Sequence, residues 1–245
     1  MTEILQDRIP LDMREKRALP GIQALDPRAW LHVDEAYSGQ MAYRRSLIQT
    51  RRNDVYWLEP AAENAAEEVL AEVIPHLSAL GFTLSGSDCR CPDGNVVDLQ
   101  SDAPLIVLGN LLQEDICIMD KRDRAHVLVG AILCFPASWR LSEKVGRPLI
   151  GIHDTVDEYD DRLAQRIQRL FDGVQVGRPL WRYNRLWYDD PDLYQPRSAN
   201  EPRQITPGEA RANYQRAERQ SILRLPVTKS VVFSIHTYVA ARSTK

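Results

Sequence analysis

Apolar residues recur at three- and four-residue intervals in two stretches of the chain, and this spacing predicts amphipathic helices. The first predicted helix spans residues 61–80, with Pro60 at a favoured first-turn position. Pro75 is expected to bend or interrupt this helix, because proline removes one backbone donor. The second predicted helix spans residues 157–171, and a shorter one is expected around residues 35–51. The apolar stripe of the first helix consists of Ala66, Val69, Leu70, Val73, Leu77 and Leu80.

From Gly81 onward the period changes to that of β-strands, and turn residues separate short apolar runs. Strands are predicted at residues 96–99, 116–119, 127–135, 180–188, 218–225 and 230–239. In the last strand, alternation places Phe233 and Ile235 on one face and Ser234 and His236 on the other. Early helices followed by antiparallel strands, with a helix between the strands, predict an α+β fold with flanking helices.

The distribution of proline, glycine and polar residues predicts a simple domain organisation. Residues 1–26 are polar and rich in proline and glycine, so we expect an extended N-terminal arm. Residues 27–240 are expected to form a single domain, followed by a tail at residues 241–245. Within that domain, residues 195–213 are rich in proline, serine and charge and predict a long loop.

Net charge, cysteine spacing and hydropathy restrict the binding partners and the cellular compartment that we expect. The net charge is −3, so the chain carries no basic field for nucleic acid. The four cysteines, Cys89, Cys91, Cys117 and Cys134, lack the spacing of a zinc or iron–sulfur site, and we expect free thiols. Neither a signal peptide nor an apolar run of about 20 residues is present. We therefore predict a cytoplasmic protein without a membrane partner.

His153 is the most interesting candidate for chemistry. It ends a proline- and glycine-punctuated segment and directly precedes a predicted helix, with Trp139, Arg140, Lys144 and Arg147 upstream. Imidazole is a common metal ligand and a usual axial ligand of haem iron. A cationic and aromatic neighbourhood suits a flat cofactor that bears propionates. From the residues alone, His153 is either such a ligand or a packed loop histidine.

Other polar residues have two interpretations each. Glu114 interrupts an apolar stretch and either steers a cationic substrate or caps a turn. Arg182 alternates with aromatic residues on a strand and either clamps a carboxylate or forms a structural ion pair. Glu218 and Arg219 open a strand and either form a hydrogen-bond network or face a ligand. The remaining histidines are expected to be structural: His32, His76, His126 and His236.

Familiar nucleotide-binding and nucleophile motifs are absent from the sequence. The phosphate-binding, dinucleotide-binding, nucleophile-elbow and zinc-protease signatures do not occur. If the protein performs redox chemistry, its electrons must therefore come from another chain.

Five segments together resemble the successive blocks of one bacterial and fungal family. They are LDPRAWLHVDEAYSGQMAYRRSL, LLQEDICIM, CFPASWRLSEKVGRPLIGIH, GRPLWRYN and RAERQSILRLPVTKSVVFSIHTY. They occur in order from about Gly21 to Tyr238, so the resemblance covers nearly the whole chain. The family is that of the haem-binding alpha subunit of haem-dependent oxidative N-demethylase, long labelled as a domain of unknown function.

The resemblance implies a PAS-like fold that binds haem b. It also implies oxidation of an N-methyl group of a small amine with dioxygen, which releases formaldehyde. Electrons would come from NADPH through separate flavin and iron–sulfur subunits, in agreement with the motifs that this chain lacks. The family's I-H-x-P-V block falls on residues 152–156, which makes His153 the implied axial ligand and metal-binding residue.

This chain departs from the family pattern at four positions. Thr155 and Asp157 stand where the family has prolines, Arg185 replaces a tryptophan, and Lys229 replaces a glycine. The first two affect the backbone near His153. The change at Arg185 affects a pocket wall and so puts the identity of the substrate in doubt.

The leading hypothesis is a haem-dependent monooxygenase of the N-demethylase type. In it, Arg182 and Arg219 contact haem propionates or substrate, and Glu114 or Glu218 holds the substrate ammonium group. One alternative is a haem-binding PAS-like sensor without turnover. Another is a subunit that has lost haem and serves a structural role. A homo-oligomer is left open.

Overall fold

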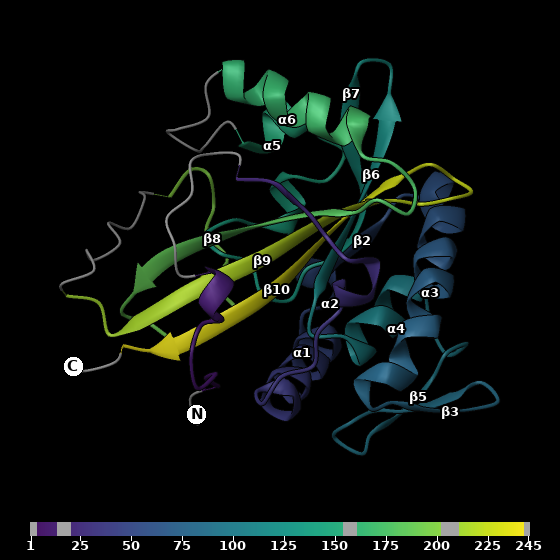
Figure 1. The fold of residues 1–245 in the computed structure, drawn as a ribbon, viewed down its shortest axis with the longest axis vertical. Helices are drawn as coiled ribbons and strands as arrows, with labels where there is room; N and C mark the ends of the chain where they lie inside the picture. Colours follow the sequence, from purple (N-terminus) through teal and green to yellow (C-terminus); the bar gives the residue numbers. More distant parts are fainter. Residues whose placement is uncertain (1–3, 14–20, 154–160, 202–210, 243–245) are drawn as a thin grey trace.

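The fold is built on one large antiparallel sheet. The computed structural model describes residues 4–13, 21–153, 161–201 and 211–242. Seven strands form this sheet in the order β1-β8-β9-β10-β6-β7-β2 (Figure 1). Their bounds are Gln23–Ala24 (β1), Leu180–Tyr188 (β8), Tyr214–Arg224 (β9), Val231–Ala241 (β10), Asp115–Arg122 (β6), Ala125–Ile132 (β7) and Tyr56–Leu58 (β2). A separate small sheet contains Thr83–Ser85 (β3), Asp88–Arg90 (β4) and Val96–Asp98 (β5).

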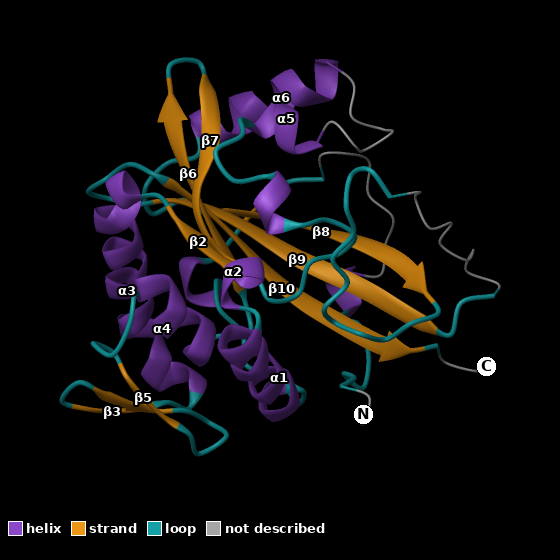
Figure 2. Cartoon of the chain, turned by 180° about the vertical axis from the view of Figure 1, so that it is seen from behind, coloured by secondary structure: helices purple, strands orange, loops and turns teal. Residues whose placement is uncertain are grey.

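Helices form two groups beside the sheet. Figure 2 shows α1, α3 and α4 together, whereas α5 and α6 lie apart from them near the β6–β7 hairpin. The bounds are Tyr37–Thr50 (α1), Arg52–Val55 (α2), Glu63–Leu77 (α3), Pro104–Leu111 (α4), Leu149–His153 (α5) and Asp161–Gly173 (α6). Short 3-10 turns occur at Leu11–Met13, Pro27–Ala29, Pro60–Ala62, Ser78–Leu80 and Leu141–Glu143.

The predicted α+β class is confirmed, and so are most of the predicted elements. Strand β8 has the predicted bounds, and β10 starts one residue later than predicted. Helix α3 runs on through Pro75 to Leu77, so the proline does not interrupt it. The four-residue α2 and the eight-residue α4 were not predicted, and α4 is buried at nearly every position. A short run in which nearly every residue is apolar has no helical period, which is why sequence patterning does not detect α4.

Alternation along the strands divides the apolar core into two clusters. The larger cluster joins the sheet to α1, α3 and α4 and contains Val232 of β10. The smaller cluster joins the sheet to α5 and α6, and Phe233 packs against it. Gly109 of α4 permits a close approach in the larger cluster, because a Cβ atom there would lie 2.7 Å from Ile132 of β7. The two faces of the sheet therefore have different surroundings.

The N-terminal segment, which comprises the described residues 4–13 and 21–34, is tied to the sheet rather than extended away from it. Gln6 donates its backbone N–H to Val239 O at 2.8 Å, and its side-chain oxygen accepts from Val239 N at 2.8 Å. Strand β1 pairs with β8 and forms one edge of the sheet. Residues 14–20 of the predicted arm and residues 202–210 of the predicted loop lie outside the described part of the chain.

Candidate functional site

The face of the sheet covered by α5 and α6 carries three apolar side chains in a row, which we call the apolar wall. They are Leu180, Ile222 and Phe233, which are neighbours in register on β8, β9 and β10. They lie in one apolar cluster with side chains from the two helices, because alternate residues of a strand point to the same face. The helix residues in this cluster are Leu149 and Ile152 of α5 and Ile167, Leu170 and Phe171 of α6.

Two residues further along the same strands, the face becomes polar. Arg182 pairs in register with Gln220, and Asn184 pairs with Glu218. We call these four residues the polar patch. The Glu218 carboxylate is held within it, because Oε2 accepts from Asn184 Nδ2 at 2.9 Å and from Gln220 Nε2 at 3.1 Å. Polar strand residues are thus organised beside the apolar wall.

Arg182 is the unsatisfied member of the polar patch. The residue is half-buried, its Nε is fully buried, and its side chain makes no hydrogen bond or ion pair with any residue in the described ranges. Burial lowers the pKa of Arg182, an effect that the nearby Glu218 opposes. A buried guanidinium without a partner is costly, and a carboxylate is the group that satisfies it best. The arrangement is suited to an anionic ligand group.

The segment that leads to His153 is fixed next to this face. Residues 146 and 147 bond to Leu128 of β7, at 2.9 Å and 3.1 Å. The buried Lys144 donates its Nζ to Ile152 O at 2.5 Å, at the carboxyl end of α5, where a cation is favourable. His153 is the last residue of α5, and its imidazole lies outside the described part of the chain. Its role as a ligand therefore stays a prediction.

A second polar cluster surrounds His236 and includes Glu114; of these two, only Glu114 was a candidate functional residue in the sequence. His236 of β10 bonds through Nδ1 to Glu114 Oε1 and through Nε2 to Asp34 Oδ2, both at 3.0 Å. We call these three residues the carboxylate clamp. Glu114 and His236 are each 1% exposed, so Glu114 is neither solvated nor at the surface. Glu114 Oε1 also accepts from His32 N at 2.9 Å.

Charges within the carboxylate clamp shift the pKa values of its members. Burial opposes the charged form of His236, but Glu114 and Asp34 outweigh burial and raise its pKa to about 9. Burial likewise opposes ionisation of Asp34, and the His236 bond lowers the pKa of Asp34 to about 2. The neighbouring His32 behaves oppositely, because burial and the charge of His236 lower its pKa to about 4. The clamp therefore holds an imidazolium between two carboxylates at neutral pH.

Arg219 belongs to this second cluster rather than to the polar patch. Its guanidinium donates to Ala29 O at 2.8 Å and to Trp30 O at 3.3 Å, and lies 5.1 Å from the centre of the Trp181 ring. The structure thus separates the sequence-predicted residues into two pairs. Arg182 and Glu218 lie in the polar patch, whereas Glu114 and Arg219 lie with His236 and the N-terminal segment.

Asp34 is the member of the carboxylate clamp that the sequence did not single out. Asp34 is 202 residues from His236, and no local pattern signals that pairing. Gln220 follows Glu218 at the two-residue spacing of a strand face, so its position was available from the sequence.

Neither clustered metal-ligand side chains nor disulfides add a further candidate site within the described residues. In the described ranges, no three His, Cys, Asp or Glu side chains are arranged to hold a metal ion. A haem iron needs only one or two protein ligands, so this finding does not bear on haem. All four cysteines are buried free thiols. No helix in the described ranges has the length and apolar character needed to cross a membrane.

Comparison with known families gives a match over most of the chain. The family model for "Haem-dependent oxidative N-demethylase, alpha subunit-like" proteins matches residues 21–243. This span contains the apolar wall, the polar patch, α5 and the carboxylate clamp.

Proposed function

The chain belongs to the family of proteins like the alpha subunit of haem-dependent oxidative N-demethylase, and from this premise we propose that it is a haem-dependent oxygenase. Its substrate would be a small N-methylated amine, and its products formaldehyde and the demethylated amine. The observation that carries the proposal is the unpartnered Arg182 next to an apolar wall on the face covered by α5 and α6.

The sheet supports a PAS-like fold. In chain order β6, β7, β8, β9 and β10 are five antiparallel strands, and the helices α5 and α6 lie between the second and third of them. In space the order is second, first, fifth, fourth, third, and this order supports the proposed PAS-like fold. A ligand of such a fold would lie between the sheet and the helices α5 and α6.

The residues on this face fit haem. The apolar wall suits the macrocycle, and Arg182 would pair with a propionate through charge-assisted hydrogen bonds. His153, at the end of α5, would be the axial ligand of the iron. When bound, haem would supply the activation of dioxygen, with electrons from NADPH through separate flavin and iron–sulfur subunits.

Glu218 is the better placed of the two carboxylates for the substrate ammonium group. Asn184 and Gln220 hold its Oε2, whereas its Oε1 accepts no hydrogen bond from the described residues and lies 3.9 Å from Arg216 Nε. Glu114 is already committed to His236 and His32. With Arg182 neutralised by a propionate, Glu218 would keep a negative charge to attract and orient the amine.

Turnover of methylated amines tests this proposal. Protein produced with a haem supply is reduced in the presence of dioxygen and offered dimethylamine, trimethylamine and N-methylglycine. We expect formaldehyde in proportion to the amine consumed. Glu218→Gln should raise KM at least tenfold with an unchanged Soret band, whereas the exposed control Glu72→Gln should leave KM unchanged.

Two outcomes would contradict the proposal. A Soret band without formaldehyde from any amine would favour a haem-binding sensor. The absence of a Soret band would favour a haem-free subunit.

A further inference from the structure

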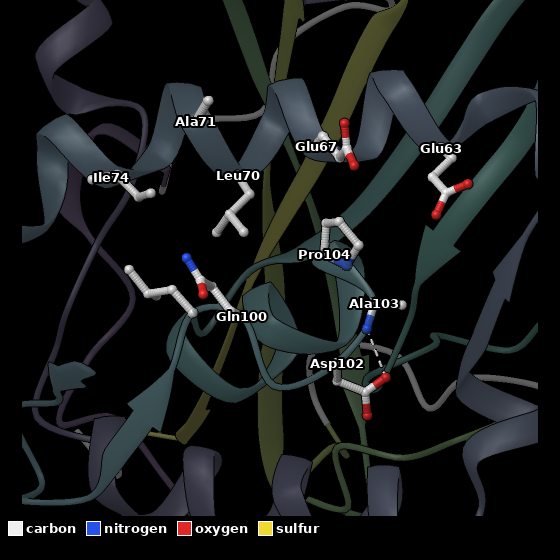
Figure 3. A pocket seen from close by; sticks show the side chains of 10 residues that line it. Glu63, Glu67, Leu70, Ala71, Ile74, Gln100, Asp102, Ala103 and Pro104 are labelled. Atoms are coloured by element: carbon white, nitrogen blue, oxygen red, sulfur yellow. Dashed lines mark hydrogen bonds between the residues drawn. The ribbon is translucent and has the colours of Figure 1, made fainter. Parts of the chain in front are cut away.

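A groove of about 600 Å³ lies between α3 and the residues that join β5 to α4. Figure 3 shows Leu70 and Ile74 of α3 on one side of it and Ala103 and Pro104 on the other. Leu70, Ile74, Ala103 and Pro104 are all half-buried, so the groove exposes part of an apolar surface. It lies with α3 and α4, away from α5 and α6 (Figure 1).

One end of the groove carries unpaired negative charge. Glu63 and Glu67 are exposed and lie one turn apart on α3, and their carboxylates make no ion pair or hydrogen bond within the described residues. Like charges at this spacing cost a helix roughly 0.2–0.5 kcal/mol. Asp102, across the groove, is already paired with Arg52 at 2.6 Å and 2.7 Å. Glu63 and Glu67 are therefore the carboxylates available to a ligand.

Along one face of α3, two carboxylates are followed by two apolar side chains. Glu63, Glu67, Leu70 and Ile74 are spaced by four, three and four residues, which places them on one helix face. The stripe is about 17 Å long at 1.5 Å per residue. A matching ligand has cations at one end and aliphatic groups at the other.

We propose that this groove docks a basic, amphipathic segment of a partner protein subunit. Lys or Arg side chains of that segment would pair with Glu63 and Glu67, and its aliphatic side chains would cover Leu70 and Ile74. Nucleic acid and anionic membranes carry the same sign of charge as the groove and are repelled. The inference rests on the proposed function only in that an alpha subunit needs a partner chain.

A synthetic peptide tests the proposal with the full-length protein. The probe is a labelled twelve-residue helix-forming peptide with two lysines in its first turn and three leucines at helical spacing, and binding is measured by fluorescence anisotropy. We expect the double variant E63Q/E67Q to bind it at least tenfold more weakly. The control Glu72→Gln lies on α3 outside the groove and should not change binding.

Three results would overturn the proposal. They are equal binding by the wild type and the double variant, equal binding of a peptide with glutamates in place of the lysines, and no binding of the lysine peptide. The Soret band of haem-supplied protein is recorded for the same variants and should not change. Failure of docking and failure of the haem proposal are therefore separate results.

Discussion

At the scale of single residues, buried charge is the feature that most needs explanation. His236 lies 3.0 Å from one carboxylate oxygen of Asp34 and 3.0 Å from one of Glu114, and His236 and Glu114 are both buried. Removing one partner of such an arrangement leaves an uncompensated buried charge, which typically costs about 3–5 kcal/mol. The carboxylate clamp fastens the N-terminal segment to β10, because Asp34 comes from that segment and also accepts from Gln6.

Stability should fall in alkaline solution because of His236. Its pKa is raised from 6.5 to about 9 on folding, so its contribution is complete below pH 6.5 and is lost as the pH rises through 9. We expect a loss of roughly 2–3 kcal/mol between these limits, measured by urea unfolding. His32, Tyr238 and Arg219 also face this site, and His236→Gln should remove the histidine part of the pH dependence.

Because His236→Gln leaves two carboxylates without a cation, that variant risks unfolding. A second measurement is the NMR titration of the His236 ring in the wild-type protein. A midpoint near pH 9 agrees with the clamp, whereas a midpoint at or below 6.5 would rule it out.

Because of Arg182, the affinity of the protein for haem should depend on whether the propionate groups are free or esterified. A charge-assisted pair is worth about 1.5–3 kcal/mol, so the wild type should bind haem at least tenfold tighter than its dimethyl ester. Arg182→Gln should lose this preference, and the exposed control Arg178→Gln should keep it. Absorption titrations of the haem-free protein give both affinities. An unchanged preference in Arg182→Gln would remove Arg182 from the haem site.

Sequence reasoning found residues whose signal is local and missed those whose partners are distant. Arg182 and Glu218 were identified because polar residues inside a predicted strand are unusual. Their adjacency, by contrast, depends on the register of β8 with β9. Asp34 lies in an irregular segment, and its role depends on where the whole N-terminal segment packs against β10.

At the scale of elements, the β9–β10 turn contains a residue in a left-handed conformation. Lys229, at a position where the resemblance leads us to expect glycine, adopts φ 65°, a conformation that disfavours side chains. Glu68 of α3 nevertheless fixes the turn by accepting from Val227 N, Thr228 N and Thr228 Oγ1. The hairpin thus keeps its shape while carrying local strain.

Lys229→Gly should relieve that strain. We expect a gain of about 0.5–1 kcal/mol, which corresponds to a rise in Tm of about 1–4 °C for a chain of this size. Lys229→Ala is the matched control, since it removes the same side-chain contact to Pro226 O but retains the strain. Calorimetry compares the three proteins. Equal gains in both variants would show that the backbone conformation is not the cause.

Elements with a clear period were predicted, and elements without one were not. The amphipathic α3 and α6 and the alternating β10 follow from their own residues. The apolar α4 and the short β3 and β4 depend on tertiary packing. Pro75 lies two residues before the end of α3, where the loss of a backbone donor disturbs little of the helix.

At the scale of the whole molecule, the sheet separates two groups of polar residues. The face with α5 and α6 carries the apolar wall and the polar patch, which together suit a large ligand with carboxylates. The carboxylate clamp, by contrast, secures the N-terminal segment. The groove beside α3 lies apart from α5 and α6 (Figure 2), so partner docking and haem binding would occupy different surfaces.

The Soret band of haem-supplied protein tests the central claim most directly. We predict a Soret band in the wild type and in the control His76→Ala, and its loss or a marked shift in His153→Ala. All three proteins should show the same far-ultraviolet circular dichroism. An unchanged Soret band in His153→Ala, or no band in the wild type, would contradict the account.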